Sequence, residues 1–348
     1  MEQEFLSPLK VLTIGDHHFK TTNVKESLEF CDKIYELLDK ENIDIVVNMG
    51  DTLDRHENIH VIPLTNSIKF TNNIIKKKPL YKIIGNHDRP NNNDFLSDNH
   101  PFYAMHGTPN LTIVDKVIVK EIKGMKFAFV PYVHPGRLFE ALDTNKDTKT
   151  DSIRDIKTVF GHHELYGTNM GVVVSTIGDK WPLNYPHFIS GHIHDYVRPQ
   201  DNITYVGTPM QHAFGDRDDK TVSIWTIYPD KLPVERRIDL GLTKRKIVTL
   251  KSNEVINWIP PTGYLNKLII EGSSSEIKAI MKLEYIKTLT KKGVKIVYNT
   301  IDEINIGTNK KINFEDIKLS YSERLKAIIS QNKTEAYWFN KIFGGTNF

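Results

Sequence analysis

The segment IDIVVNMGDTLDR, residues 43–55, contains the pattern that decides the fold. Its apolar, β-branched run Ile43–Val47 leads into Gly50, and charged and polar side chains follow. Such a run predicts a buried strand that ends in a polar turn. The same pattern appears in KVLTIGDHH at residues 10–18 and in YKIIGNHD at residues 81–88. The first third of the chain therefore contains three strands of one kind.

Helices are predicted between these strands, and more strands after them. Apolar residues at helical spacing indicate helices over Val24–Lys40 and Ile62–Lys77, and this alternation predicts βαβ units in a largely parallel sheet. Val117–Ile122 and Lys126–Val130 predict a hairpin. Further strands are expected at Thr158–Phe160, His187–Ser190, Ile203–Val206 and Val222–Ile227. We therefore predict an α/β protein in which two sheets pack face to face in a sandwich covered by helices.

The last third of the chain predicts a smaller unit. After a break near Arg236–Thr243, strands are indicated at Lys246–Leu250, Leu265–Glu271 and Val294–Tyr298. A helix is predicted over Ser273–Lys292, with Ser274 or Ser275 as its N-cap and Gly293 as its stop. We divide the chain into a main domain over residues 1–240, a small α/β domain over residues 241–300 and a C-terminal segment over residues 301–348.

Composition limits the class of protein. Of 348 residues, 39% are hydrophobic and 26% are charged, which is ordinary for a soluble domain. The start of the chain, MEQEFLSPLK, lacks the pattern of a signal peptide, and no apolar stretch approaches the length of a membrane span. A single cysteine, Cys31, excludes an internal disulfide framework and a cysteine metal cluster. We expect a reducing, cytoplasmic setting without membrane contact.

Charge is distributed unevenly along the chain. Residues 241–348 contain 18 Lys and Arg against 10 Asp and Glu, whereas the preceding part contains 28 against 33. An acidic N-terminal part suits metal binding, and a basic C-terminal part suits a polyanion. On charge alone, a solvated lysine-rich surface is the simpler explanation.

Five short motifs supply the side chains for a metal site. Three follow the strands quoted above, and two follow strands of the second half: FGHH at residues 160–163 and SGHIH at residues 190–194. Because the carboxyl ends of parallel strands meet at one edge of a sheet, we expect these side chains to converge. The candidate ligands are Asp16, His18, Asp51, Asn86, His162, His192 and His194. Any one of these motifs can arise by chance in a loop. Five of them in fixed order, each directly after an apolar strand, point to a site.

The types of side chain indicate the metal and the chemistry. Carboxylate, amide and imidazole ligands suit Mn²⁺, Fe²⁺ or Zn²⁺. By position we assign Asp16, His18 and His194 to one metal, and Asn86, His162 and His192 to a second. Asp51 would bridge the two at about 3.5–4 Å, as in two-metal phosphoesterases. His87 is left over to act as the acid toward the leaving oxygen, with Asp88 orienting it.

In order, the motifs D-x-H, GD-x-x-D-R, GNHD, GH and GH-x-H resemble those of the calcineurin-like metallophosphoesterase superfamily, over about residues 11–194. This resemblance implies a four-layer α/β sandwich with two metals. A sixth motif, Tyr205–Gln211 followed by Phe214-Gly215-Asp216, is similar to a signature of the SbcD-type nucleases, as is Phe160–Gly167. These proteins are the nuclease subunits of SbcCD and MRN-type repair and recombination complexes.

The SbcD-type resemblance implies an activity and partners. It implies a metal-dependent DNA nuclease, acting as a 3′–5′ exonuclease and single-strand endonuclease with Mn²⁺, or alternatively Mg²⁺. It also implies a homodimer inside a heterotetramer with an SbcC-type coiled-coil ATPase, and a small capping domain that binds DNA. Two features depart from the pattern: Asp54 stands where archaeal and eukaryotic members have His, and His163 lies beside a ligand. Asp54 and the short chain favour a viral or minimal bacterial form, and His163 is either a spare ligand, a phosphate contact, or a surface or core histidine.

The small domain and the C-terminal segment contain candidate contacts to these partners. Two basic clusters suit DNA phosphates: Lys244, Arg245 and Lys246, and then Lys287, Lys291 and Lys292. A solvated helix face explains the second cluster equally well. The C-terminal segment is expected to contain a linker, Asn299–Asn313, and helices at Ser320–Gln331 and Thr334–Phe343 that dock on the ATPase. Packing of these helices on the main domain is the alternative.

Two other functions compete with the nuclease. One is a phosphodiesterase or phosphatase for a small substrate, against which the Tyr205–Gln211 motif and the basic small domain argue. The other is a catalytically inactive scaffold for DNA ends, which would require a missing ligand or acid. Gly215–Thr221 superficially resembles a phosphate-binding loop, but it lacks the second glycine before Lys220 and leads into a strand, so it is rejected.

Overall fold

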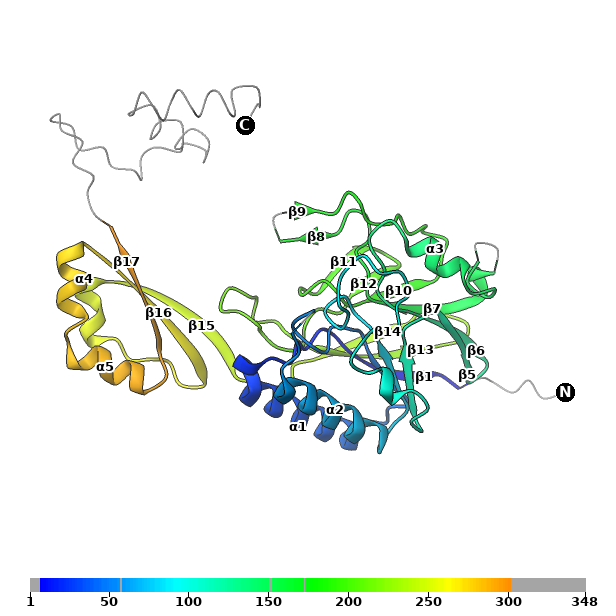
Figure 1. Ribbon diagram of the computed structural model, residues 1–348, viewed down its shortest axis with the longest axis horizontal. Helices are drawn as coiled ribbons and strands as arrows, with labels where there is room; N and C mark the ends of the chain where they lie inside the picture. The colour runs from blue at the N-terminus through cyan, green and yellow to red at the C-terminus, as the bar shows by residue number, and fades with distance from the viewer. Residues whose placement is uncertain (1–6, 57, 150–151, 172, 302–348) are drawn as a thin grey trace, which may run out of the picture.

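The structure, a computed structural model, describes residues 7–56, 58–149, 152–171 and 173–301. Figure 1 shows a large lobe and, joined to it through β15 (Lys244–Lys251), a small lobe. The strands of the large lobe form two six-stranded sheets and one short hairpin, while those of the small lobe form a three-stranded sheet. Chemistry in this molecule depends on how the two large sheets meet.

The first sheet has the strand order β14-β13-β1-β2-β3-β4. Its strands are β1 (Leu9–Ile14), β2 (Ile45–Asn48), β3 (Leu80–Ile83), β4 (Leu111–Val114), β13 (Val222–Ile227) and β14 (Val234–Ile238). Strands β1 to β3 pair in parallel as predicted, β4 pairs in parallel with β3, and β13 pairs antiparallel with both β1 and β14. β4 and β14 were not predicted: they are the two edge strands of the sheet, β4 is only partly buried in its first two residues, and β14 has the polar sequence VERRI.

The second sheet has the order β11-β12-β10-β7-β6-β5. Its strands are β5 (Ile118–Ile122), β6 (Met125–Val130), β7 (Ile156–Gly161), β10 (His187–Ser190), β11 (Val197–Gln200) and β12 (Ile203–Tyr205). The predicted hairpin is confirmed as β5 and β6, and Lys123 and Gly124 form its turn with φ of 51° and 73°. Strands β6, β7, β10 and β12 pair in parallel. β11 was not predicted, and β8 (Asn169–Met170) and β9 (Val173–Val174) form the separate short hairpin.

Side-chain alternation along the strands builds the layers. On β1, Leu9 and Val11 pack between the two sheets, whereas Leu12 and Ile14 pack toward the helices. Helices α1 (Val24–Lys40) and α2 (Val61–Ile75) cover the first sheet, as Figure 1 shows, and α3 (Leu138–Asp143) packs against the second. The predicted four-layer sandwich is therefore confirmed. Short 3-10 helices lie at Thr21–Asn23, Tyr103–Met105, Ile153–Asp155 and Ser252–Asn257.

The small lobe is a three-stranded parallel sheet, β15-β16-β17, with two helices packed on it. β16 spans Tyr264–Gly272 and β17 spans Lys295–Thr300. The single helix predicted over Ser273–Lys292 is wrong, since α4 (Ser274–Ile280) and α5 (Glu284–Lys291) are separate. The interruption changes the phase of the helix. A continuous helix would turn Glu284 inward below Ile280, whereas the break buries Ile286 instead.

Two further predictions for this region need correction. The N-cap of α4 is Ser273, whose hydroxyl accepts from the Glu276 N–H while the Glu276 carboxylate accepts from the Ser273 N–H. Neither of the serines predicted as caps holds that position. Asn299 belongs to β17 and not to a linker. The rest of the predicted linker after residue 301, and the two predicted C-terminal helices, lie outside the described residues.

Candidate metal centre

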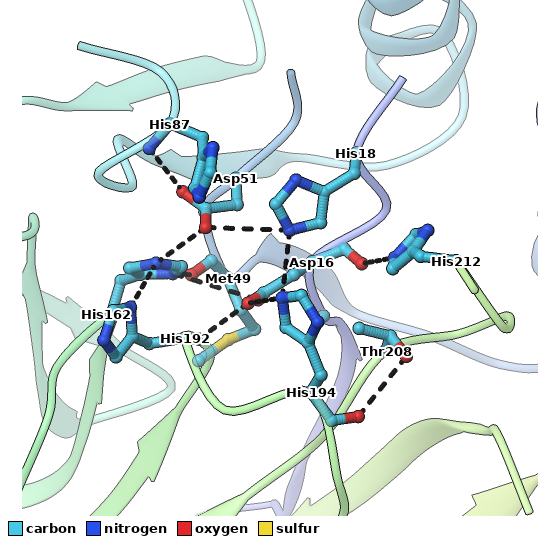
Figure 2. Close-up of polar contacts among 12 residues, drawn as sticks. Asp16, His18, Met49, Asp51, His87, His162, His192, His194, Thr208 and His212 are labelled. Carbon is cyan, nitrogen blue, oxygen red and sulfur yellow. Dashed lines mark hydrogen bonds and ion pairs between the residues drawn. The ribbon is translucent and has the colours of Figure 1, made fainter. Parts of the chain in front are cut away.

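The motif residues meet where strands of both large sheets end. Asp16, Asp51 and Asn86 follow β1, β2 and β3, which are neighbours in the first sheet. His162 follows β7, and His192 and His194 follow β10, its neighbour in the second sheet. Figure 2 shows the aspartates and histidines of this set turned toward one centre. The predicted convergence of the five motifs is thus what the structure contains.

One group consists of Asp16, His18 and His194, whose ligand atoms all lie within 4.8 Å of one another. The Nε2 atoms of His18 and His194 are 3.1 Å apart, and His194 Nε2 lies 4.0 Å from a carboxylate oxygen of Asp16. Asp16 is fully buried, whereas the side chain of His194 is 47% exposed. This group therefore opens to solvent on the His194 side.

A second group consists of Asp51, His162 and His192. The amide oxygen of Asn86 lies 3.0 Å from His162 Nε2 and 3.0 Å from His192 Nδ1. Asp51 Oδ2 lies 3.3 Å from His162 Nε2 and 3.8 Å from His18 Nε2, so this carboxylate stands between the two groups. The structure thus brings the residues of both assigned sets together, with Asp51 between them.

Backbone strain is concentrated at this centre. His18, Asp51 and His192 have φ of 43°, 46° and 80°, in the left-handed region that non-glycine residues rarely adopt. Such conformations persist where the surrounding structure enforces them, and they gather at functional sites. A side chain at Gly50 or Gly85 would collide with His162 or Asp51, respectively. The glycines that precede these motifs therefore leave room for the ligands.

Burial and mutual charge shift the acid–base behaviour of the centre. Burial raises the pKa of Asp16 to about 8. Burial alone would lower the pKa of His162, but the carboxylates of Asp51 and Asp16 raise it to about 9. His192 behaves differently, because burial lowers its pKa to about 3. The buried carboxylates therefore rely on protons or cations for compensation.

The donor set fits divalent cations. His162 Nδ1 donates to the Met49 carbonyl at 2.8 Å, which leaves the lone pair of Nε2 directed at the centre. With the ring proton on Nδ1, His162 Nε2 faces two further acceptors, Asn86 Oδ1 at 3.0 Å and Asp51 Oδ2 at 3.3 Å. The buried Asp16 Oδ1 has no hydrogen-bond partner among the described residues. Convergent lone pairs of this kind are satisfied by a cation, and oxygen and imidazole ligands suit Mn²⁺ or Zn²⁺.

His87 lies at the edge of the metal centre, but the residue that orients it differs from the predicted one. Its Nδ1 donates to the Asp54 carbonyl at 2.8 Å, and its ring centroid is 4.9 Å from that of His18. Asp88 instead accepts from the backbone N–H groups of Thr52, Leu53 and Gly85 at 3.0–3.3 Å. The role predicted for Asp88 in orienting His87 is therefore corrected. Asp88 joins the loops that follow β2 and β3, and the carbonyl of Asp54 orients His87.

Sequence reasoning missed residues that support the ligands. His212 Nε2 donates to the Asp16 carbonyl at 2.9 Å, and Figure 2 shows its ring beside this group. Lys220, only 7% exposed, donates to the His194 carbonyl at 2.8 Å. Asp54 accepts from Lys20 and has a carboxylate oxygen 3.7 Å from His18 Nδ1. The signal for His212 was its place between the two parts of the sixth motif, which was considered only as a family signature.

His163, beside a ligand, is a core residue. It is 2% exposed, burial lowers its pKa well below the usual range, and its ring lies 5.8 Å from that of Phe188. Neither ring nitrogen has a hydrogen-bond partner among the described residues. This outcome agrees with the last of the three alternatives left open for His163, a core histidine.

A further cluster of the same residue types lies beyond β3. His100, His106 and Asp115, which we name the His100 cluster, have ligand atoms within 4.8 Å of one another. Asp115 directly follows β4, and its Oδ2 lies 3.3 Å from His100 Nε2 and 2.7 Å from His106 Nε2. The Phe102 N–H donates to His100 Nδ1 at 3.2 Å. His100 Nε2 therefore carries the proton and donates it to Asp115, so that it has no lone pair for a metal.

The residues predicted to contact DNA differ in accessibility. Lys246 on β15, and Lys287, Lys291 and Lys292 at α5, are exposed. Lys244 pairs with Asp239 at 3.1 Å. Arg245 has a side chain only 13% exposed and pairs with Glu26 of α1 at 3.1 Å, so its prediction as a phosphate contact is corrected.

Fold and site together define a class, the phosphoesterases with a dinuclear metal site. The sequence profile of the family described as calcineurin-like phosphoesterase matches residues 9–196. The chain belongs to this family. It is 36% identical over 294 residues to "Putative phosphoesterase 078R" of Invertebrate iridescent virus 3, covering 83% of this chain and 84% of that protein. It is 37% identical over 279 residues to "Putative phosphoesterase 244L" of Invertebrate iridescent virus 6, covering 78% and 97%.

The two viral proteins match more than the catalytic core. Because each alignment covers at least 78% of the chain, both extend past residue 196 toward the small lobe. Among the described residues, no helix combines the length and apolar character that crossing a membrane requires. The activity supported by fold, site and relatives is hydrolysis of a phosphoester, and the substrate needs a separate argument.

Proposed function

We propose that the protein is a metal-dependent DNA nuclease, a 3′–5′ exonuclease and single-strand endonuclease that acts as the nuclease subunit of an SbcCD-type repair and recombination complex. The observation that carries the substrate is the position of the sixth motif. Gln211, the last residue of its first part, contacts Arg245 of the small lobe, and the next residue, His212, contacts the metal centre. The motif that resembles SbcD-type nucleases thus joins the phosphoester chemistry to a basic domain.

The roles at the centre follow from the geometry. Asp16, His18 and His194 would hold one divalent ion, and Asn86, His162 and His192 the other, with Asp51 between them. When bound, such a pair activates water and stabilises the charge of an in-line displacement at phosphorus. Mn²⁺ is the expected ion and Mg²⁺ the alternative. His87 Nδ1 donates a hydrogen bond to the Asp54 carbonyl, so the imidazolium form of this ring would carry its second proton on Nε2, pass it to the leaving oxygen and be left neutral.

The small lobe supports a polyanionic substrate. Between residues 241 and 300 there are eleven Lys and Arg against four Asp and Glu. Exposed lysines at positions 246, 287, 291 and 292 suit phosphates, and such contacts position DNA without reading its sequence. The alternative of a catalytically inactive scaffold loses ground, because the centre contains every expected ligand and the acid.

The substrate is tested with Mn²⁺ and two kinds of phosphoester. Linear duplex DNA and short single strands are compared with p-nitrophenyl phosphate esters, using wild type, Asp51→Ala and His87→Ala. We expect cleavage of DNA that both substitutions abolish. Ester hydrolysis with intact DNA would refute the nuclease and favour a small-substrate phosphodiesterase or phosphatase. That alternative has one observation in its favour, a hollow of about 550 Å³ beside Asp54 that is lined by Lys20 and Arg55.

The partners are proposed on the family resemblance alone. They are an SbcC-type coiled-coil ATPase, bound through residues 320–348, and a second copy of this chain. Deletion of residues 320–348 should abolish association with the ATPase while Mn²⁺-dependent cleavage of short single strands continues. Binding that survives the deletion would refute the docking role. The expected cytoplasmic location is a proposal of the same kind.

A further inference from the structure

The loop between β12 and β13 has a second role, which the nuclease proposal leaves unexplained. We name residues 206–221 the connecting loop. Its His212 packs against the first metal group, with ring centroids 5.0 Å from His18 and 5.7 Å from His194. Because the Asp16 carbonyl needs a donor, the His212 proton is on Nε2 and faces the backbone of that ligand. His212 therefore supports the chain segment that carries Asp16 and His18.

The connecting loop fixes His212 through its own contacts. The Asp216 carboxylate accepts from the backbone N–H groups of His212 and Ala213 at 2.7 and 2.9 Å. The Asp216 carbonyl accepts from Gln211 Nε2 at 2.8 Å. These bonds close a short turn, so a displacement of Gln211 is passed to the neighbouring His212.

On its other side, Gln211 is held by the first strand of the small lobe. The Arg245 N–H donates to Gln211 Oε1 at 2.6 Å, and Arg245 Nε donates to the Gln211 carbonyl at 3.0 Å. Arg245 Nη2 donates to Glu26 of α1 at 3.1 Å. The guanidinium thus bonds the connecting loop and a helix of the large lobe from its place on β15. A movement of the small lobe would act directly on Gln211.

We propose that His212 is a positioning residue of the metal centre, and that Gln211 and Arg245 couple its position to that of the small lobe. The affinity of the centre for Mn²⁺ then depends on how the small lobe sits. Mn²⁺ in turn biases the position of the small lobe. A polyanion that moves this lobe changes the affinity for Mn²⁺ by the same factor by which Mn²⁺ changes the affinity for the polyanion. This inference requires the metal centre but not a DNA substrate, so it stands or fails separately from the nuclease proposal.

The test measures Mn²⁺ binding to the full chain from the electron paramagnetic resonance signal of free Mn²⁺, without any substrate. His212→Ala should weaken Mn²⁺ binding about 10–100-fold, the range for a residue that orients a ligand from behind. Arg245→Ala should weaken it about 5-fold or more, the lower end of allosteric coupling. Lys251→Ala is the matched control, since Lys251 is an exposed cation on the same strand as Arg245. It should bind Mn²⁺ like the wild type.

The double variant distinguishes coupling from two separate losses. With both Arg245→Ala and His212→Ala, the affinity should equal that of His212→Ala alone, because Arg245 acts through His212. His212→Gln keeps a donor for the Asp16 carbonyl and should recover part of the affinity. This recovery separates the loss of the donor from poor folding of His212→Ala. Unchanged affinity in His212→Ala, or strictly additive effects in the double variant, would overturn the proposal.

Discussion

The metal centre and the His100 cluster are built from the same residue types at the same edge of one sheet. The metal centre follows β1, β2 and β3, and Asp115 of the His100 cluster follows β4, the next strand. Their hydrogen bonds differ. In the His100 cluster the two Nε2 atoms face one carboxylate oxygen, and each proton has an acceptor. In the metal centre His162 gives its Nδ1 proton in a hydrogen bond to the Met49 carbonyl, and its Nε2 faces two acceptors, Asn86 Oδ1 at 3.0 Å and Asp51 Oδ2 at 3.3 Å.

This difference separates a metal site from a hydrogen-bonded cluster of the same residue types. Residue type and proximity select both clusters equally. Hydrogen-bond complementarity separates them, since a complete set of donors and acceptors needs no cation, while opposed lone pairs do. Charge agrees with this distinction. Burial would raise the pKa of Asp115, but hydrogen bonds from His100 and His106 hold it below its usual range, whereas burial raises the pKa of Asp16 to about 8.

The largest expected effect is at the bridge. Asp51→Ala removes the carboxylate between the two metal groups, so phosphoester hydrolysis should fall on the order of 10³-fold or more. Wild-type protein should bind two Mn²⁺ per chain, and this variant fewer than two, as measured by equilibrium dialysis. Asp115→Ala is the control from the other cluster and should still bind two. A third Mn²⁺ in the wild type that disappears in Asp115→Ala would break the comparison.

The second expected effect is a dependence of Mn²⁺ affinity on pH. Asp16 and His162, with pKa values of about 8 and 9, are largely protonated at pH 7 and release protons when a cation binds. Apparent affinity should therefore rise with pH, by up to about tenfold per pH unit for each proton released, and level off as pH passes these pKa values. Calorimetry in two buffers of different ionisation enthalpy measures the protons. An affinity that stays constant from pH 6 to 8 would contradict the charge state we assign.

The convergence of the candidate ligands could be predicted from the sequence because these residues directly follow apolar strands. Buried strands such as Ile45–Asn48 are read from their apolar runs, and parallel pairing then brings Asp16, Asp51 and Asn86 together without further information. The His100 cluster was missed for the corresponding reason. β4 lies at the sheet edge and is only half-buried, and no strand was predicted there, so Asp115 was not placed at a strand end.

Contacts made by the backbone could not be predicted in this way. Three histidines of the centre donate to backbone carbonyls: His162 to Met49, His87 to Asp54 and His212 to Asp16. Every residue has a carbonyl, so the sequence does not mark these three. Asp88 shows the same limit from the donor side, because it binds three backbone N–H groups and not the histidine beside it. Arg245 was interpreted as a surface cation because its partner Glu26 is more than 200 residues away.

The third effect concerns stability. Asp115→Ala leaves the buried Nε2–H of His100 without an acceptor, and an unsatisfied buried donor costs about 1–3 kcal/mol. The free energy of unfolding, measured in urea without metal, should fall by this amount. Asp115→Asn keeps an oxygen acceptor and should lose less. If added Mn²⁺ stabilised the wild type more than Asp115→Ala, the His100 cluster would be a metal site after all.

The smallest effect is expected at His106, and it tests the comparison most finely. His106 donates to Asp115 at 2.7 Å from a side chain that is 41% exposed, so water can replace the bond. His106→Ala should cost only about 0.5–1 kcal/mol in urea unfolding, the net worth of an ordinary hydrogen bond. In the metal centre His194 is similarly exposed, at 47%, yet His194→Ala should weaken Mn²⁺ binding strongly and cost the metal-free protein little. Two half-exposed histidines would then differ in what their ring nitrogen binds, a carboxylate in one case and a cation in the other. Equal responses of the two variants to Mn²⁺ would remove that distinction.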